Sequence, residues 1–434
     1  MQGHKMQQLP RSSLARPLVA ALTTAFAAGV WAQDSSEPSP YYLGVTQGFT
    51  HDTNIYGSST NQVSDTYSST GLRAGLDQTI GRQRLYANAN VQYNKYRSES
   101  SLDNTSYGVA AGWDWATINE LAGTLGATAN QSLANLGSTA GVQNATEKNL
   151  VKTDQVNTSV RWGGARALNL LAAYAHSRVS YSAPSYIGLE SSADTASTGF
   201  NYRVGPELRL GMGVRYIRTE SPYGYVVAST PPAPTTYESN TANNRSLDLT
   251  ADWSPSTLTG IDARLSWTRL TNSNVNLSAL DFSGVTGRIG TRYAVTGKTT
   301  LTASLSRDVG TNSSFYNNPT APATGSTQTT GTSLTHNSQT TDTLTLGVKY
   351  AATAKIWMGL DGSYQRAKIV YDTSSALTDT NDDTRNIGLS VDYAIARNWS
   401  LGCKFDHASR SQSGDGSSSY TENRVGCTAQ LTLR

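Results

Sequence analysis

The chain has few cysteines, few charges and no long apolar run after its first 32 residues. It contains 2 Cys in 434 residues, and 15% of its residues are charged. No later apolar run approaches the roughly 20 residues of a membrane helix, so a helical membrane protein is excluded. The hydrophobic share of 37% is low for a soluble domain. It fits a barrel wall, in which only half of each strand is apolar.

Patterns that carry catalysis or metal binding are also missing. The histidines after residue 32 are His51, His176, His336 and His407, and they have no metal-site spacing. No GxSxG motif is present. The acidic stretches 381–383 and 414–416 lack the twelve-residue calcium-loop pattern with its closing Glu. We therefore expect no enzyme activity, no cofactor and no metal.

Strict alternation of apolar and polar residues is what the sequence does contain. It is clearest from Trp399 to Arg434, where two alternating limbs flank a polar run at 411–419. A period of two predicts strands, and two such limbs around a loop predict a hairpin. About ten alternating residues per limb is enough to cross a bilayer as a tilted strand.

This hairpin repeats along the chain. Eighteen limbs are expected, at 41–56, 66–80, 84–97, 104–116, 120–133, 152–164, 167–181, 193–204, 207–220, 243–254, 258–271, 281–295, 298–310, 340–352, 355–371, 384–396, 399–410 and 421–434. Short turns alternate with long polar loops, notably at 134–151, 182–192, 221–242, 311–339 and 372–383. Residues 41–434 are thus predicted to form an all-β, antiparallel, up-and-down transmembrane barrel with short periplasmic turns and long extracellular loops.

The N-terminus is expected to direct export. Residues 1–32 have a basic start and an apolar core, which is typical of a signal peptide, and a short periplasmic lead follows at 33–40. Removal of Lys5, Arg11 and Arg16 leaves 31 Lys and Arg against 31 Asp and Glu. A neutral mature chain gives no support for a nucleic-acid partner. The expected location is the outer membrane of a Gram-negative bacterium, after Sec export.

Both cysteines lie in the closing hairpin. If Trp399 faces Leu431, then Cys403 faces Cys427 on the same side of the sheet. Directly opposed residues have Cβ atoms about 4.5–5.5 Å apart, which is close enough for a bridge. A disulfide between Cys403 and Cys427 is therefore predicted; the alternative is two small buried apolar side chains.

Charged and amide side chains share the face opposite the apolar one. We expect them to line a wet lumen: Arg73, Asp77, Asn88, Asn90, Gln92, Arg161, Arg203, Arg209, Arg215, Asp248, Asp252, Arg264, Arg288, Arg292, Lys349, Asp361, Lys404, Asp406 and Arg424. Any water-filled barrel needs such a wall, so no single residue here implies a function.

Two belts are expected on the outer surface. Basic residues of lipid-facing parity near the outer headgroups form an outer-leaflet belt that would meet lipopolysaccharide phosphates: Lys95, Arg97, Arg178, Arg218, Arg269, Arg307 and Arg366. The alternative for each is ordinary snorkelling. Tryptophans beside the short turns form a periplasmic aromatic girdle: Trp113, Trp115, Trp162, Trp253, Trp357 and Trp399.

The Ser-, Thr-, Asn- and Tyr-rich barrel, the stretch 42–56 and the ending 425–434 give the chain a family resemblance. It resembles the EpsL-like outer-membrane proteins of exopolysaccharide biosynthesis operons, within a broader group of β-barrel porins. The resemblance implies a role in exporting a polysaccharide, alongside periplasmic and inner-membrane exopolysaccharide machinery. The chain departs from usual barrels by ending in Leu433-Arg434 rather than in an aromatic residue.

Three functions remain open. The favoured one is a polymer-conducting export channel, because amides and hydroxyls would bind sugars weakly and let them slide. The second is a general or substrate-specific diffusion porin. The third is a structural or assembly barrel plugged by its loops, for which 221–242 and 311–339 are the candidates.

Overall fold

The computed structural model describes residues 39–134, 147–164, 167–228, 236–309, 338–373, 376–413 and 419–433. The expected signal peptide and most of the loop 311–339 lie outside these residues. Residues 40–434 form one compact unit. In the described part of the chain, no helix combines the length and the apolar character that a membrane crossing needs.

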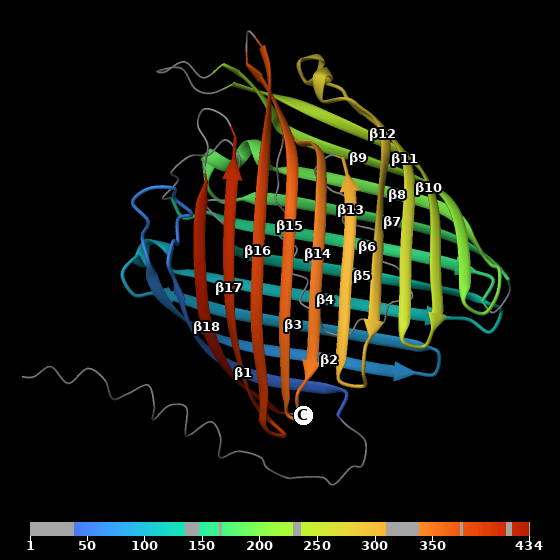
Figure 1. Cartoon of the computed structure of the whole chain (residues 1–434), viewed down its shortest axis with the longest axis horizontal. Coiled ribbons are helices and arrows are strands. Elements are labelled where there is room, and N and C mark those ends of the chain that lie inside the picture. The colour runs from blue at the N-terminus through green and yellow to red at the C-terminus, as the bar shows by residue number, and fades with distance from the viewer. Residues whose placement is uncertain are drawn as a thin grey trace, which may run out of the picture. The chain divides into compact units, whose positions relative to one another are not determined.

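Eighteen antiparallel strands close into a barrel (Figure 1). They are β1 (Tyr41–Asp52), β2 (Asp65–Ile80), β3 (Gln83–Tyr96), β4 (Asn104–Ala116), β5 (Leu121–Leu133), β6 (Leu150–Trp162), β7 (Leu168–Tyr181), β8 (Ser191–Arg203), β9 (Leu208–Ala228), β10 (Thr236–Ser256), β11 (Thr259–Asn272), β12 (Phe282–Ala294), β13 (Thr299–Asp308), β14 (Ser338–Ala351), β15 (Ile356–Thr373), β16 (Ala376–Ala396), β17 (Trp399–Gln412) and β18 (Tyr420–Leu433). The predicted fold class is confirmed.

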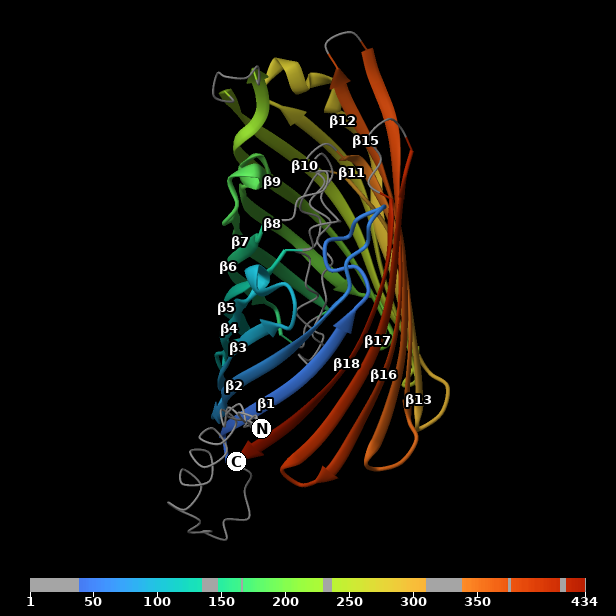
Figure 2. The same ribbon diagram turned by 90° about the vertical axis from the view of Figure 1, so that its left-hand side faces the viewer.

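Pairing of the first and last strands closes the barrel. Leu43 lies opposite Leu433, and the ladder continues to Asp52 opposite Arg424, with β1 and β18 side by side in Figure 2. β1 also pairs with β2, so no strand edge is left unpaired along this seam. A closed barrel satisfies its backbone hydrogen bonds internally, as a bilayer requires.

Turn chemistry explains the short-turn end. Gly81, between β2 and β3, has φ 61°, and Gly163 and Gly164 after β6 have φ 126° and 47°. These left-handed conformations are accessible to glycine at little cost, which lets the chain reverse within a few residues.

The strands at the long-loop end are longer than expected in two hairpins. β9 continues to Ala228, and β10 already begins at Thr236. In the same way β15 continues to Thr373, and β16 begins at Ala376. The expected loops 221–242 and 372–383 are therefore mostly strand. These extensions lie beyond the bilayer, where a strand needs no apolar face. The sequence there does not alternate between apolar and polar residues, so the alternation could not predict these strand residues.

The outward face carries an apolar band. On β9, Leu210, Met212, Val214 and Tyr216 point outward and are 38–54% exposed. From Leu208 to Tyr216 the strand rises about 26 Å at about 3.3 Å per residue. A tilt of about 40° makes this about 20 Å along the barrel axis, close to the ~25 Å band of outer-membrane barrels. The structure is a transmembrane barrel of the outer-membrane type.

The predicted disulfide is confirmed. Cys403 on β17 lies directly opposite Cys427 on β18, as Trp399 does opposite Leu431, and the two sulfur atoms are bonded. Both residues have the outward parity of Leu401 and Phe405, so the bridge lies on the apolar face.

We expect the bridge to stabilise the closing hairpin. Its sequence separation is 24 residues, for which the loop-entropy model gives an upper value of about 3.5 kcal/mol. Urea unfolding of C403A/C427A should show a lower free energy of unfolding than the oxidised wild type. Reductant should lower the free energy of unfolding of the wild type to that of the variant, and it should leave the free energy of unfolding of the variant unchanged. Equal stability of all four samples would contradict this expectation.

Candidate functional site: the inner wall of the barrel

Cross-strand register assigns every strand residue to one face. Directly opposed residues share a face, and following the pairs around the barrel returns to the starting parity at β1. All nineteen side chains expected to line the lumen have the inward parity. The large exposed apolar residues are mostly on the other parity.

Six arginines form a continuous group on the inward face of β8 to β12, which we call the arginine wall: Arg203, Arg209, Arg215, Arg264, Arg288 and Arg292. Two of its pairs are directly opposed across neighbouring strands, Arg203 with Arg209 and Arg264 with Arg288. Directly opposed like charges destabilise a sheet. The inward aspartates at 248, 252, 262 and 308 are fewer than these arginines, so this wall is net positive.

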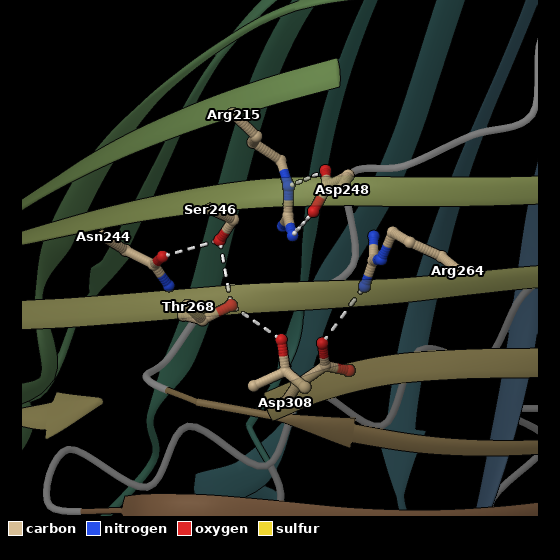
Figure 3. Close-up of polar contacts among 8 residues, drawn as sticks. Arg215, Asn244, Ser246, Asp248, Arg264, Thr268 and Asp308 are labelled. Atoms are coloured by element: carbon tan, nitrogen blue, oxygen red, sulfur yellow. Dashed lines mark hydrogen bonds and ion pairs between the residues drawn. The ribbon is translucent and has the colours of Figure 1, made fainter. Parts of the chain in front are cut away.

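Two arginines of this wall form buried ion pairs with aspartates. Arg215 donates to Asp248 through Nε at 3.0 Å and Nη2 at 3.2 Å. Arg264 Nη2 donates to Asp308 at 3.3 Å. The arginine side chains are each 8% exposed. Figure 3 shows both pairs beside each other above the strands.

A chain of hydroxyls lies next to these pairs. Ser246 Oγ donates to Asn244 Oδ1 at 3.1 Å and lies 3.0 Å from Thr268 Oγ1. Thr268 Oγ1 in turn lies 2.8 Å from Thr286 Oγ1. These links join β10, β11 and β12 across their inward faces.

Several inward polar side chains of β10–β12 are buried, and their exposed fractions indicate how far water reaches this part of the barrel interior. Ser266, Thr268 and Thr286 are 0%, 3% and 4% exposed, and Asp248 is 5% exposed. Polar side chains that faced a wide, water-filled lumen would be largely solvated. The inward face of β10–β12 is therefore closed to bulk water at this level, and solvent reaches other parts of the wall.

Arg288 and Arg292, on β12, are the exposed members of the arginine wall. Neither guanidinium forms an ion pair with another residue in the described ranges. Gly290 lies between them, opposite Asp262. An added Cβ at Gly290 would come within 2.7 Å of an Asp262 oxygen, so glycine makes room for that carboxylate. Both guanidiniums are thus exposed to solvent on the inward face.

The inward face of β3 to β7 differs in character. Asn88 and Asn90 are exposed there, and Gln92 lies beside them. Small residues lie opposite amides, with Gly108 opposite Asn90 and Gly126 opposite Asn157. An added Cβ at Gly126 would contact Asn157. Among the described residues, β5 and β7 have no inward charge. The barrel interior thus has one amide-rich wall with few charges, among them Arg84 and Arg161, and one arginine wall.

Arg84 is an inward residue that the sequence-based set omitted. It donates to Asp77 through Nε at 2.8 Å and Nη2 at 2.6 Å, and it lies 3.8 Å from Asp114. Its guanidinium is 5.2 Å from the Tyr86 ring centroid, and Arg73 is 5.4 Å from that of Tyr42. Arg84 shares the parity of Asn88, so alternation alone could have identified it.

An apolar cluster fills part of the long-loop end. Its buried members include Leu102 of η1 (Ser100–Leu102) and Tyr186 of η3 (Pro184–Leu189), both 0% exposed. Burial raises the pKa of the Tyr186 phenol. Burial, and then the hydrogen bond from Tyr56 to the Glu99 carboxylate, raises the pKa of Tyr56. These phenols stay neutral at physiological pH.

The periplasmic girdle needs one correction. Trp113, Trp115, Trp162, Trp253 and Trp399 lie on the outward face near the short turns. Trp357 lies opposite Ala351 and Asp392 and shares the inward parity of Asp361. Proximity to a turn does not decide which face a residue takes, whereas its parity does.

The outer-leaflet belt is of mixed charge rather than purely basic. Lys95, Arg178, Arg218, Arg269, Arg307 and Arg366 have the outward parity, and Arg97 follows directly after β3. Three of these arginines are ion-paired: Arg218 with Glu220 at 2.5 Å, Arg307 with Asp342 at 2.6 Å and Arg366 with Asp383 at 2.8 Å.

The expected acidic loop stretch 381–383 lies within β16. Asp382 faces inward and accepts hydrogen bonds from Arg410 of β17, with Nε at 2.9 Å and Nη2 at 2.7 Å. The stretch 414–416 and His336 lie outside the described residues. Across the described ranges, no group of three or more His, Cys, Asp or Glu is arranged to hold a metal ion.

Comparisons with known proteins find similarity only among solved structures. No protein-family model matches the chain, and no curated protein matches it. The Pseudomonas aeruginosa OpdK structure with vanillate is 12% identical, with 91% of this chain and 99% of that chain covered and a TM-score of 0.45. OccK2 (OpdF) of the same organism is 14% identical, with 91% and 98% covered and a TM-score of 0.46. A ferric enterobactin receptor (PfeA) mutant, also from Pseudomonas aeruginosa, is 10% identical, with 91% and 81% covered and a TM-score of 0.44.

Proposed function

We propose that this protein is a diffusion channel in the outer membrane of a Gram-negative bacterium, and that it passes small hydrophilic solutes with a preference for anions. The outward apolar band and the closed barrel support the membrane location. The arginine wall carries the anion preference. In particular, Arg288 and Arg292 are exposed on the inward face without a described acidic partner.

Small solutes are a better match to this interior than a polymer. The polysaccharide export expected from the family resemblance needs a wide lumen lined by hydroxyls and amides along its length. The hydroxyl-rich inward patch at Ser266, Thr268 and Thr286 is instead buried. Inward amides are most numerous on β3 to β6 and fewer on the other strands.

Ion selectivity of the wild type tests the proposal. The purified barrel in planar lipid bilayers should give steady single-channel currents, and the reversal potential in a salt gradient should indicate anion preference. Low salt is needed, because charges are screened beyond about 10 Å at 0.1 M. Added polysaccharide should leave the current unchanged. Block by the polymer would favour export, and the absence of any current would favour a plugged structural barrel.

A further inference from the structure

One arginine pair on the outward face differs from the rest of the outer-leaflet belt. Arg245 on β10 lies directly opposite Arg269 on β11, and both are exposed. Arg245 was not among the belt residues expected from the sequence. Directly opposed like charges destabilise a sheet, so this arrangement has a cost when nothing neutralises it.

Neighbouring arginines of the belt have their own carboxylates. Arg218, Arg307 and Arg366 each form an ion pair with an acidic residue of the same or the next strand. Within the described ranges, neither Arg245 nor Arg269 forms an ion pair. Arg245 and Arg269 therefore place two positive charges directly opposite each other, with no carboxylate of the described residues paired to either.

The pair lies at the upper edge of the apolar band. Below Arg245, the outward side chains of β10 are Leu247, Leu249, Ala251 and Trp253. Below Arg269, those of β11 are Trp267, Leu265, Ala263 and Ile261, and Trp267 is 63% exposed. β10 continues to Thr236 beyond Arg245, which is about 30 Å of further strand at about 3.3 Å per residue. The two guanidiniums are thus at headgroup height, not in a loop.

We propose that Arg245 and Arg269 bind a phosphate group of outer-leaflet lipopolysaccharide. Opposed Cβ atoms lie about 5 Å apart, so two arginine side chains can converge on one phosphate. Guanidinium binds phosphate oxygens through two parallel N–H donors. The exposed Trp267 indole lies two residues below Arg269, where an amphipathic ring meets the boundary of headgroup and acyl chain. A lipid with phosphate above and acyl chains below fits this surface.

This inference rests on the proposed outer-membrane location but not on conduction. The test measures binding of phosphorylated lipid A to the purified full barrel in detergent, by native mass spectrometry and by titration. R245Q/R269Q should bind it at least about tenfold more weakly than the wild type, with partial recovery in R245K/R269K. R288Q/R292Q, which changes the same number of arginines on the inward face, should bind normally.

Phosphate dependence and stability provide the second arm. Dephosphorylated lipid A should bind the wild type as weakly as phosphorylated lipid A binds R245Q/R269Q. Inorganic phosphate at millimolar concentration should not compete with phosphorylated lipid A for the wild type. Because removal of one arginine relieves like-charge repulsion, R245Q should be at least as heat-stable as the wild type in lipid-free detergent. Wild-type affinity of R245Q/R269Q, or binding independent of the lipid phosphates, would overturn the inference. A channel that fails to conduct but still shows these differences would refute only the proposed function.

Discussion

Replacing Arg288 and Arg292 by glutamate should convert the channel from anion-preferring to cation-preferring. Both side chains are exposed on the inward face, and in the proposed channel a permeating ion would pass them in water. A unit charge about 8 Å from a monovalent ion contributes about 0.5 kcal/mol at the dielectric constant of water. Changing two positive charges into two negative ones alters the ion's energy by about 2 kcal/mol, which is more than tenfold in relative permeability.

Reversal potentials in a salt gradient measure this change directly. R288E/R292E should give a potential of opposite sign to the wild type, and R288Q/R292Q one near zero. R245E/R269E carries the same charge change on the outward face and should keep the wild-type sign. A potential that stays at the wild-type value in R288E/R292E would show that ions do not pass the arginine wall.

Replacing Asp382 by alanine should destabilise the barrel strongly. The Arg410 and Asp382 side chains are 1% and 3% exposed, and they are joined by two or more hydrogen bonds. Removal of the carboxylate takes this ion pair away from a guanidinium that is itself buried. Breaking a buried pair in this way costs about 3–5 kcal/mol.

Urea unfolding followed by heat-modified gel mobility measures this loss. The double variant D382L/R410M, which removes both charges, should recover most of the lost stability. D342A provides the control, since the Arg307–Asp342 pair is 58% and 38% exposed. An exposed pair is worth about 0–1 kcal/mol. If D382A and D342A lose the same stability, burial does not govern the strength of these pairs.

Sequence alternation determined the fold and most face assignments. A period of two places residues i and i+2 on one face, so the nineteen inward side chains and the Cys403–Cys427 pairing followed from parity and one register. Glycines at two short turns, Gly81 and Gly163–Gly164, marked the ends of β2 and β6, because their left-handed backbone conformation is readily accessible to glycine. These features are local, and so they can be read from neighbouring residues.

The tertiary structure decided what depends on contacts between strands. Asp342 and Asp383 neutralise Arg307 and Arg366 only because register brings each aspartate opposite its arginine. The burial of Asp248 and Ser266 depends on what surrounds them in three dimensions, which no alternation records. The extensions of β9 and β10 lie beyond the apolar band, where bilayer and sequence impose no pattern. Register and packing are non-local, and for that reason the ion pairs and the burial within the candidate site emerged only from the closed barrel.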